Sequence, residues 1–144
     1  MDSQEAALGM LKPGNTISQA MQACVRVIVQ GLVDLDILRG SVAANVEKET
    51  WRTYFMHGLG HWLGLDVHDV GIYIINNIDR PLQVGMVMTV EPGLYIPASA
   101  IVDDQFKGIG IRIEDDIVIT PGGNHIMTSK APKAVSDIEA LMAT

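Results

Sequence analysis

Three of the four histidines in this chain of 144 residues, His57, His61 and His68, lie in one short segment, spaced four and then seven residues apart. Imidazole is the commonest neutral metal ligand and exchanges protons readily near neutral pH. Two later acidic residues, Glu91 and Glu114, each lie in an apolar, strand-like run, where an unpaired carboxylate would be costly. Together the five residues predict a hydrolytic metal site.

His61 is the strongest ligand candidate, because glycines on either side of it, at positions 60 and 64, let the backbone approach a site closely. Each glutamate also has a structural interpretation. Glu91 could form a buried ion pair with Arg112. Such a pair adds little to stability, so its presence would still need a functional explanation. Glu114 could instead belong to a solvated acidic triplet at 114–116.

Four other residues of chemically active types have simpler explanations. His125 lies in a predicted turn and is expected on the surface, and Cys24 lies within a predicted helix and is expected in the core. Asp34 and Asp36 alternate as metal ligands can, but they follow a helix and are expected to be solvated.

The composition excludes several classes of protein. A net charge of −7 argues against nucleic acid as a partner, because such binding rests on neutralisation of phosphates by Lys and Arg. No apolar run approaches the roughly 18 residues that span a bilayer, and the first residues lack the pattern of a secretion signal. A single cysteine fits a reducing cytoplasm, and 144 residues fit one domain, 1–144.

Helices are expected before the histidines and strands after them. Helical patterns cover 2–11, a stretch from Thr16 or Ser18 to about Leu32, and 42–55. Strand patterns cover 72–75, 86–90, 94–96 and, most clearly, 108–120, before a turn at 121–124. Ser136 and Glu139 predict a capping box for a last short helix.

The parity of the run 108–120 assigns its side chains to two faces. Successive residues of a strand point to opposite sides, so Arg112 and Glu114 share one face. The other face is expected to carry Ile109, Ile111, Ile113, Ile117 and Ile119. The predicted fold class is α+β, with helices on one face of a curved, mainly antiparallel sheet.

Three sequence blocks, in order, resemble the proline-directed metallopeptidases of the creatinase or pita-bread fold, and most closely the C-terminal catalytic part of the aminopeptidase P group. The blocks are HGLGH at 57–61 with Gly64 and His68-Asp69 after it, TVEPGLY at 89–95 and GIRIEDD at 110–116. The resemblance implies a partial pita-bread fold and release of an N-terminal residue from peptides with proline in second position.

The resemblance also implies roles for single residues. His61 and Glu91 would bind one metal of a dinuclear centre, and Glu114 would bridge both metals. His68 would hydrogen-bond the substrate, and His57 and Arg112 would help to line the pocket for the proline. The metal would be a divalent cation, most often manganese, with cobalt or zinc as other choices.

One part of the family pattern is missing. The dinuclear centre normally includes two aspartates from an earlier strand, and no such strand is evident between Met1 and His57. We therefore expect the 144 residues alone to have little or no peptidase activity, and an apolar sheet face, left uncovered, to drive formation of a homo-oligomer. Two alternatives stay open: a non-catalytic peptide-binding or oligomerising module of the same fold, and a prolidase, which shares the histidine block.

Overall fold

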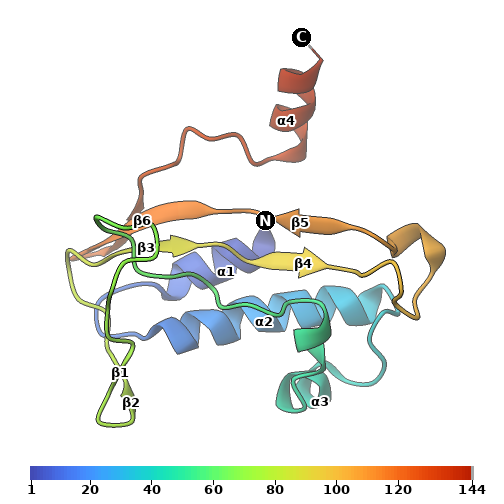
Figure 1. The fold of residues 1–144 in the computed structure, drawn as a ribbon, viewed down its shortest axis with the longest axis horizontal. Helices are drawn as coiled ribbons and strands as arrows, with labels where there is room; N and C mark the ends of the chain where they lie inside the picture. Colours follow the sequence, from blue (N-terminus) through green and yellow to red (C-terminus); the bar gives the residue numbers. More distant parts are fainter. Residues whose placement is uncertain (144) are drawn as a thin grey trace.

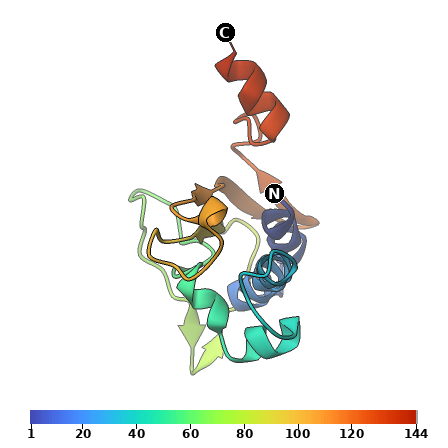
Figure 2. The same ribbon diagram turned by 90° about the vertical axis from the view of Figure 1, so that its right-hand side faces the viewer.

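Two helices form one layer of the molecule and pack against the central strands. The computed structural model describes residues 1–143, and in it α1 (Asp2–Met10) and α2 (Ile17–Asp34) lie side by side along the strands (Figures 1 and 2). Their buried side chains share one core with Met88, Val90, Ile117 and Ile119 of the sheet. No helix within residues 1–143 combines the length and the apolar character that a membrane crossing requires.

α2 begins where its sequence predicted. Thr16 is its N-cap: the Thr16 hydroxyl accepts a hydrogen bond from the Gln19 backbone N–H, and the Gln19 side chain accepts one from the Thr16 backbone. This capping box satisfies two backbone donors that the helix itself leaves unpaired. One face of α2 is buried in the core, which fixes the helix against the strands that carry the site.

Cys24 lies on the buried face of α2, as predicted, and is fully buried. Burial raises the pKa of the Cys24 thiol to about 12. We expect a thiol reagent at about pH 8 to label Cys24 only after unfolding in urea, because the thiolate is the reactive form. The free energy of unfolding should also fall as the pH rises from about 8.5 towards the raised pKa, since only the unfolded state ionises freely there. Rapid labelling of the native protein would contradict this burial.

All the strands pair in antiparallel fashion, and four of them lie on two extended segments of the chain, 87–95 and 110–120, which run side by side. β3 (Val87–Val90) pairs with β6 (Asp115–Thr120), and β6 pairs with β7 (Gly123–Ile126). Further along the same two segments, β4 (Gly93–Tyr95) pairs with β5 (Gly110–Arg112). A separate hairpin, β1 (Ile74–Ile75) with β2 (Ile78–Asp79), lies at the edge of the molecule (Figure 1). Each long segment is interrupted once, and both interruptions matter for the site.

The predicted single strand over 108–120 is therefore two strands, with residues 113–114 between them. Ile117 and Ile119 are buried, but Ile109 and Ile111 are exposed. The physical reason is that the shared core includes β6 and not β5. Beside β5, Ile111 and Ile113 line an open, mainly apolar pocket of about 310 Å³ next to α2. Of the five isoleucines predicted on one face, only the two in β6 are buried.

The predicted helix over 42–55 is also divided. α3 (Val42–Glu47) ends early, Glu49 has a left-handed backbone with φ 52°, and a 3₁₀ helix, η1 (Thr50–Thr53), follows. The buried Asn45 side chain explains part of this path, because it donates to the Ser41 carbonyl and accepts from the Thr50 hydroxyl. These contacts hold the turn between the two short helices. A second 3₁₀ helix, η2 (Asp104–Phe106), lies in the loop between β4 and β5.

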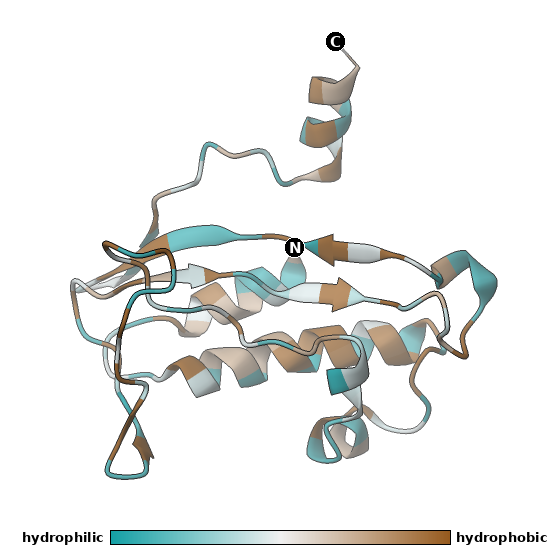
Figure 3. Ribbon diagram, in the orientation of Figure 1, coloured by the Kyte–Doolittle hydropathy of each residue, from teal (hydrophilic) through white to brown (hydrophobic). Residues whose placement is uncertain are grey.

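The C-terminal region differs from its prediction in two ways. Gly123, Asn124 and His125, expected in a turn, lie in strand β7 because they complete a tight hairpin with β6. α4 (Val135–Met142) starts after Ala134 without a side-chain cap. Ser136 is already inside this helix and donates to Asp137, so the predicted capping box is wrong. α4 projects from the body and exposes apolar side chains such as Val135 (Figures 1 and 3).

Candidate metal centre

The segment that carries His61 lies antiparallel to β3 and is joined to it by an isolated bridge between Trp62 and Met88 and by backbone hydrogen bonds. The Thr89 backbone N–H donates to the His61 carbonyl at 2.9 Å, and the Glu91 N–H donates to the Leu59 carbonyl at 2.7 Å. This close pairing requires a glycine at position 60, because a Cβ there would lie 2.0 Å from the Thr89 carbonyl oxygen. Of the two glycines that predicted a close approach at His61, Gly60 permits a direct backbone contact with β3, and Gly64 permits close contact with the Asp69 side chain.

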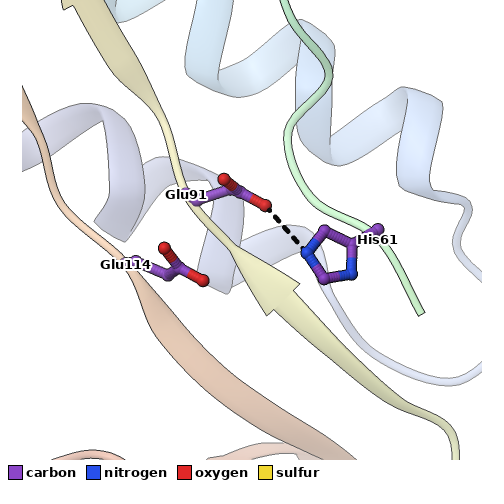
Figure 4. A group of neighbouring side chains, drawn as sticks. All are labelled: His61, Glu91 and Glu114. Atoms are coloured by element: carbon purple, nitrogen blue, oxygen red, sulfur yellow. Dashed lines mark ion pairs between the residues drawn. The ribbon is translucent and has the colours of Figure 1, made fainter. Parts of the chain in front are cut away.

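The structure brings His61, Glu91 and Glu114 together, as the sequence predicted. Each offers one ligand atom within 4.8 Å of the others, and His61 Nε2 lies 3.3 Å from Glu91 Oε1. Figure 4 shows that the three side chains come from three chain segments and point toward a common space. Glu91 lies in the interruption between β3 and β4, and Glu114 in the matching interruption between β5 and β6. The two breaks thus bring the carboxylates beside each other.

The orientation of the His61 ring suits metal binding. Its Nδ1 lies 3.0 Å from the Trp62 carbonyl oxygen, which can only accept a hydrogen bond. Donation from Nδ1 to this carbonyl leaves Nε2, 3.3 Å from Glu91 Oε1, as the ring nitrogen available to a metal. Metal-binding histidines usually have this arrangement, in which the second nitrogen donates to a carbonyl or carboxylate.

The charges of the group also fit a cation. Glu91 and Glu114 place two carboxylates close together, and Arg112 lies near both, at 3.8 Å from Glu91 and 3.9 Å from Glu114. These distances exceed those of hydrogen-bonded ion pairs. Glu91 and Arg112 therefore form only a long ion pair, and the 52% exposure of the Arg112 side chain shows that it is not the fully buried pair considered from the sequence. One imidazole nitrogen and carboxylate oxygens form a donor set that suits a divalent cation.

The other predicted site residues occupy different positions around the group. The exposed His68 lies edge-on to His61, with ring centroids 4.3 Å apart. His57 contacts a different partner: its Nδ1 donates to the Gly58 carbonyl, which leaves Nε2 to accept from the Tyr95 hydroxyl at 3.0 Å. Outside this region, His125 is exposed, as expected.

Thr89 is a residue of the site that the sequence reasoning missed. Its buried hydroxyl accepts from the His61 backbone N–H at 3.0 Å and donates to Glu91 Oε1 at 2.9 Å. It therefore links the two residues closest to each other in the group. Parity could have found it, because Thr89 and Glu91 are two residues apart on a strand and so share a face.

Replacing Thr89 by valine, which has nearly the same shape without the hydroxyl, should weaken Mn²⁺ binding by roughly 10- to 100-fold, the usual effect of losing a group that orients a ligand. Thr89→Ser keeps the hydroxyl and should stay close to wild type. Titration calorimetry on both variants measures the effect. Equal affinities for the valine and serine variants would contradict an orienting role.

Comparison with known proteins agrees with this geometry. The model of metallopeptidase family M24 matches residues 1–121. An Xaa-Pro aminopeptidase of Haemophilus influenzae is 52% identical over 99% of this chain and 33% of its own length. A human Xaa-Pro dipeptidase is 38% identical over 98% of this chain and 34% of its own length. The chain thus spans about a third of these relatives.

The solved structures show the same fold. Pseudomonas aeruginosa aminopeptidase PepP superposes with a TM-score of 0.95 at 46% identity, over 98% of this chain and 32% of the other. The mixed helices and antiparallel strands thus form part of the pita-bread fold of aminopeptidase P, as the sequence predicted. With the family model covering most of its length, this chain belongs to metallopeptidase family M24.

Proposed function

We propose that this chain is the metal-binding part of an Xaa-Pro aminopeptidase, which releases the N-terminal residue from peptides with proline in second position. The observation that carries the proposal is the convergence of His61, Glu91 and Glu114 from three segments in a chain of family M24. The similarity to an Xaa-Pro aminopeptidase at 52% identity supports the substrate class. A buried free cysteine is consistent with a cytoplasmic location.

In this function His61, Glu91 and Glu114 hold the metal, for which manganese is our first choice and cobalt or zinc the others. The chemistry that a bound divalent cation supplies is polarisation of the peptide carbonyl and activation of water. The Trp62 carbonyl and the Thr89 hydroxyl keep the His61 ring and the Glu91 carboxylate in place.

Three further residues are proposed to contact the peptide. His68 lies against His61, where its imidazole can hydrogen-bond a substrate held at the site. Arg112 lies beside both glutamates, and we propose that it and His57 border the pocket for the proline. The Tyr95 hydroxyl fixes the His57 ring in that pocket.

The test is Mn²⁺-dependent recognition of proline peptides by the 144-residue chain. Binding of a tripeptide Xaa-Pro-Xaa, followed by NMR, should require Mn²⁺, exceed that of the matched Xaa-Ala-Xaa peptide, and disappear in His61→Ala. Turnover of the peptide should be slow or absent. The expected dinuclear centre has five ligands, and among the described residues only three candidate ligands lie together. Failure to bind Mn²⁺, or equal binding of both peptides, would overturn the proposal.

A dipeptidase is the second candidate, because the human Xaa-Pro dipeptidase is also similar over almost the whole chain. The same assay separates the two: a prolidase prefers the dipeptide Xaa-Pro, whereas an aminopeptidase accepts longer peptides. Metal-dependent peptide binding that is unaffected by the length of the peptide and by proline would instead support the non-catalytic binding module.

We also expect the chain to form a homodimer or a larger oligomer. Ile111 of β5 and Val135 of α4 are well exposed, and Ile101 in the loop before β5 is fully exposed. Apolar surface of this kind promotes association. Light scattering at several concentrations should give a mass of at least two chains. A monomeric mass at high concentration would contradict this expectation.

A further inference from the structure

Asp115 is a buried acidic residue directly beside a proposed metal ligand. It follows Glu114 and is the first residue of β6, paired with Val90 of β3. Within β6 alternate residues share a face, so Asp115 lies on the same face as the buried Ile117 and Ile119, whereas the Glu114 side chain is 41% exposed. Asp115 is 1% exposed. A charge is rarely buried this deeply unless it is paired, so its surroundings call for an explanation.

The partners of Asp115 come from the segment between β7 and α4. Its Oδ1 accepts hydrogen bonds from Lys133 Nζ and from the Thr128 hydroxyl, both at 2.7 Å. The Thr128 hydroxyl in turn accepts from the Asp116 backbone N–H, and the Met127 N–H donates to the Asp116 carbonyl. Thr128 and Lys133 therefore tie the segment 127–133 to the first residues of β6.

Glu114 has few constraints of its own. It lies between β5 and β6, outside both ladders. Its side chain is 41% exposed, and its ion pair with Arg112 is long, at 3.9 Å. The direction of its carboxylate thus depends on how the backbone is held on either side. Before it, the Ile113 N–H donates to the Pro92 carbonyl at 3.3 Å, and after it Asp115 is anchored.

We propose that Asp115, anchored by Lys133 and Thr128, is a positioning residue that keeps Glu114 directed toward His61 and Glu91. The inference rests on the proposed metal site. The hydrogen bonds of Asp115 to Lys133 and Thr128 hold the start of β6. They therefore fix the backbone orientation of the preceding residue, Glu114. The other oxygen, Asp115 Oδ2, is buried without a hydrogen-bond partner among the described residues, so Oδ1 carries the whole anchor.

Stability alone does not account for the anchor, because replacing a buried ion pair by apolar residues is often neutral or stabilising. The anchor instead serves to orient the Glu114 carboxylate. On this basis, the segment after the sheet contributes to metal affinity although it supplies none of the three proposed ligands. This consequence can be measured separately from folding.

The test compares Mn²⁺ affinity with stability measured without metal. Lys133→Met should weaken Mn²⁺ binding by about tenfold or more, as expected when a group that orients a ligand is lost. Lys107→Met is the matched control, since Lys107 pairs with Asp104 on the surface at 2.6 Å, away from the site. It should bind Mn²⁺ as wild type does.

Lys133→Met leaves a buried charge and could lose stability, so the double variant Asp115→Leu/Lys133→Met completes the design. It should regain thermal stability but still bind Mn²⁺ weakly. If Asp115 and Lys133 served stability alone, Mn²⁺ affinity would recover together with stability. Wild-type affinity in a folded double variant would overturn the inference, as would a loss that only follows the unfolded fraction. Absence of Mn²⁺ binding by the wild type would instead overturn the metal site itself, and the inference with it.

Discussion

Glu91→Gln is expected to weaken Mn²⁺ binding by more than about 100-fold, since groups that merely orient ligands already contribute 10- to 100-fold. Glu91 is central to the group: its Oε1 lies 3.3 Å from His61 Nε2, and its side chain is 13% exposed. Glutamine keeps the shape and one carbonyl oxygen, but it removes the negative charge that a divalent cation requires. The substitution therefore tests ligation rather than packing.

The stability of the same variant provides a second measurement. Without metal, Glu91 and Glu114 repel each other, and Arg112 is too exposed and too distant to compensate fully. Glu91→Gln should therefore unfold at the wild-type temperature or slightly above it in metal-free buffer. Added Mn²⁺ should raise the melting temperature of wild type only, because a ligand stabilises the state that binds it.

Glu139→Gln is the control for this experiment. It makes the same chemical change on the exposed helix α4 and should leave both Mn²⁺ affinity and melting temperature unchanged. Equal Mn²⁺ affinities for Glu91→Gln and wild type would show that His61, Glu91 and Glu114 do not lie together in order to bind a metal. The metal site, and with it the proposed function, would then fail.

The sequence predicted those parts of the fold that depend on local signals. Thr16, one of the two predicted starts, is the N-cap of α2. The left-handed backbone at Glu49 and the break at residues 113–114 have no such signal. Both depend on contacts with distant elements: Asn45 holds the turn after α3, and β5 and β6 pair with different strands.

The site was predictable as a set of residue types, and less so as a geometry. We identified His61, Glu91 and Glu114 because an imidazole or a carboxylate within an apolar run is costly to bury unless it binds a metal or an oppositely charged group. Thr89 and Asp115 were missed, because a threonine in a strand or an aspartate in an acidic triplet is ordinary in sequence. Their roles follow only from which face of the sheet they occupy and what lies there.

Gly60→Ala is expected to have the largest effect on both stability and metal binding. A Cβ at Gly60 would lie 2.0 Å from the Thr89 carbonyl oxygen and 2.9 Å from its hydroxyl. Both atoms belong to β3 or to the contacts that hold His61, so neither can move without displacing the group. Overpacking of this kind costs about 3 kcal/mol of stability, at the upper end of the usual range. We expect a folded variant to show no measurable Mn²⁺ binding.

Gly58→Ala is the matched control, because a Cβ at Gly58 would meet its nearest neighbour at an ordinary 3.8 Å. Both variants add one methyl group to a glycine in the same short segment, and they differ only in the space available. Urea unfolding and Mn²⁺ titration should therefore leave Gly58→Ala close to wild type. If Gly60→Ala matched it in both measurements, the 59–63 segment could not lie against β3 as described, and His61 would lose the backbone contact that places it beside Glu91.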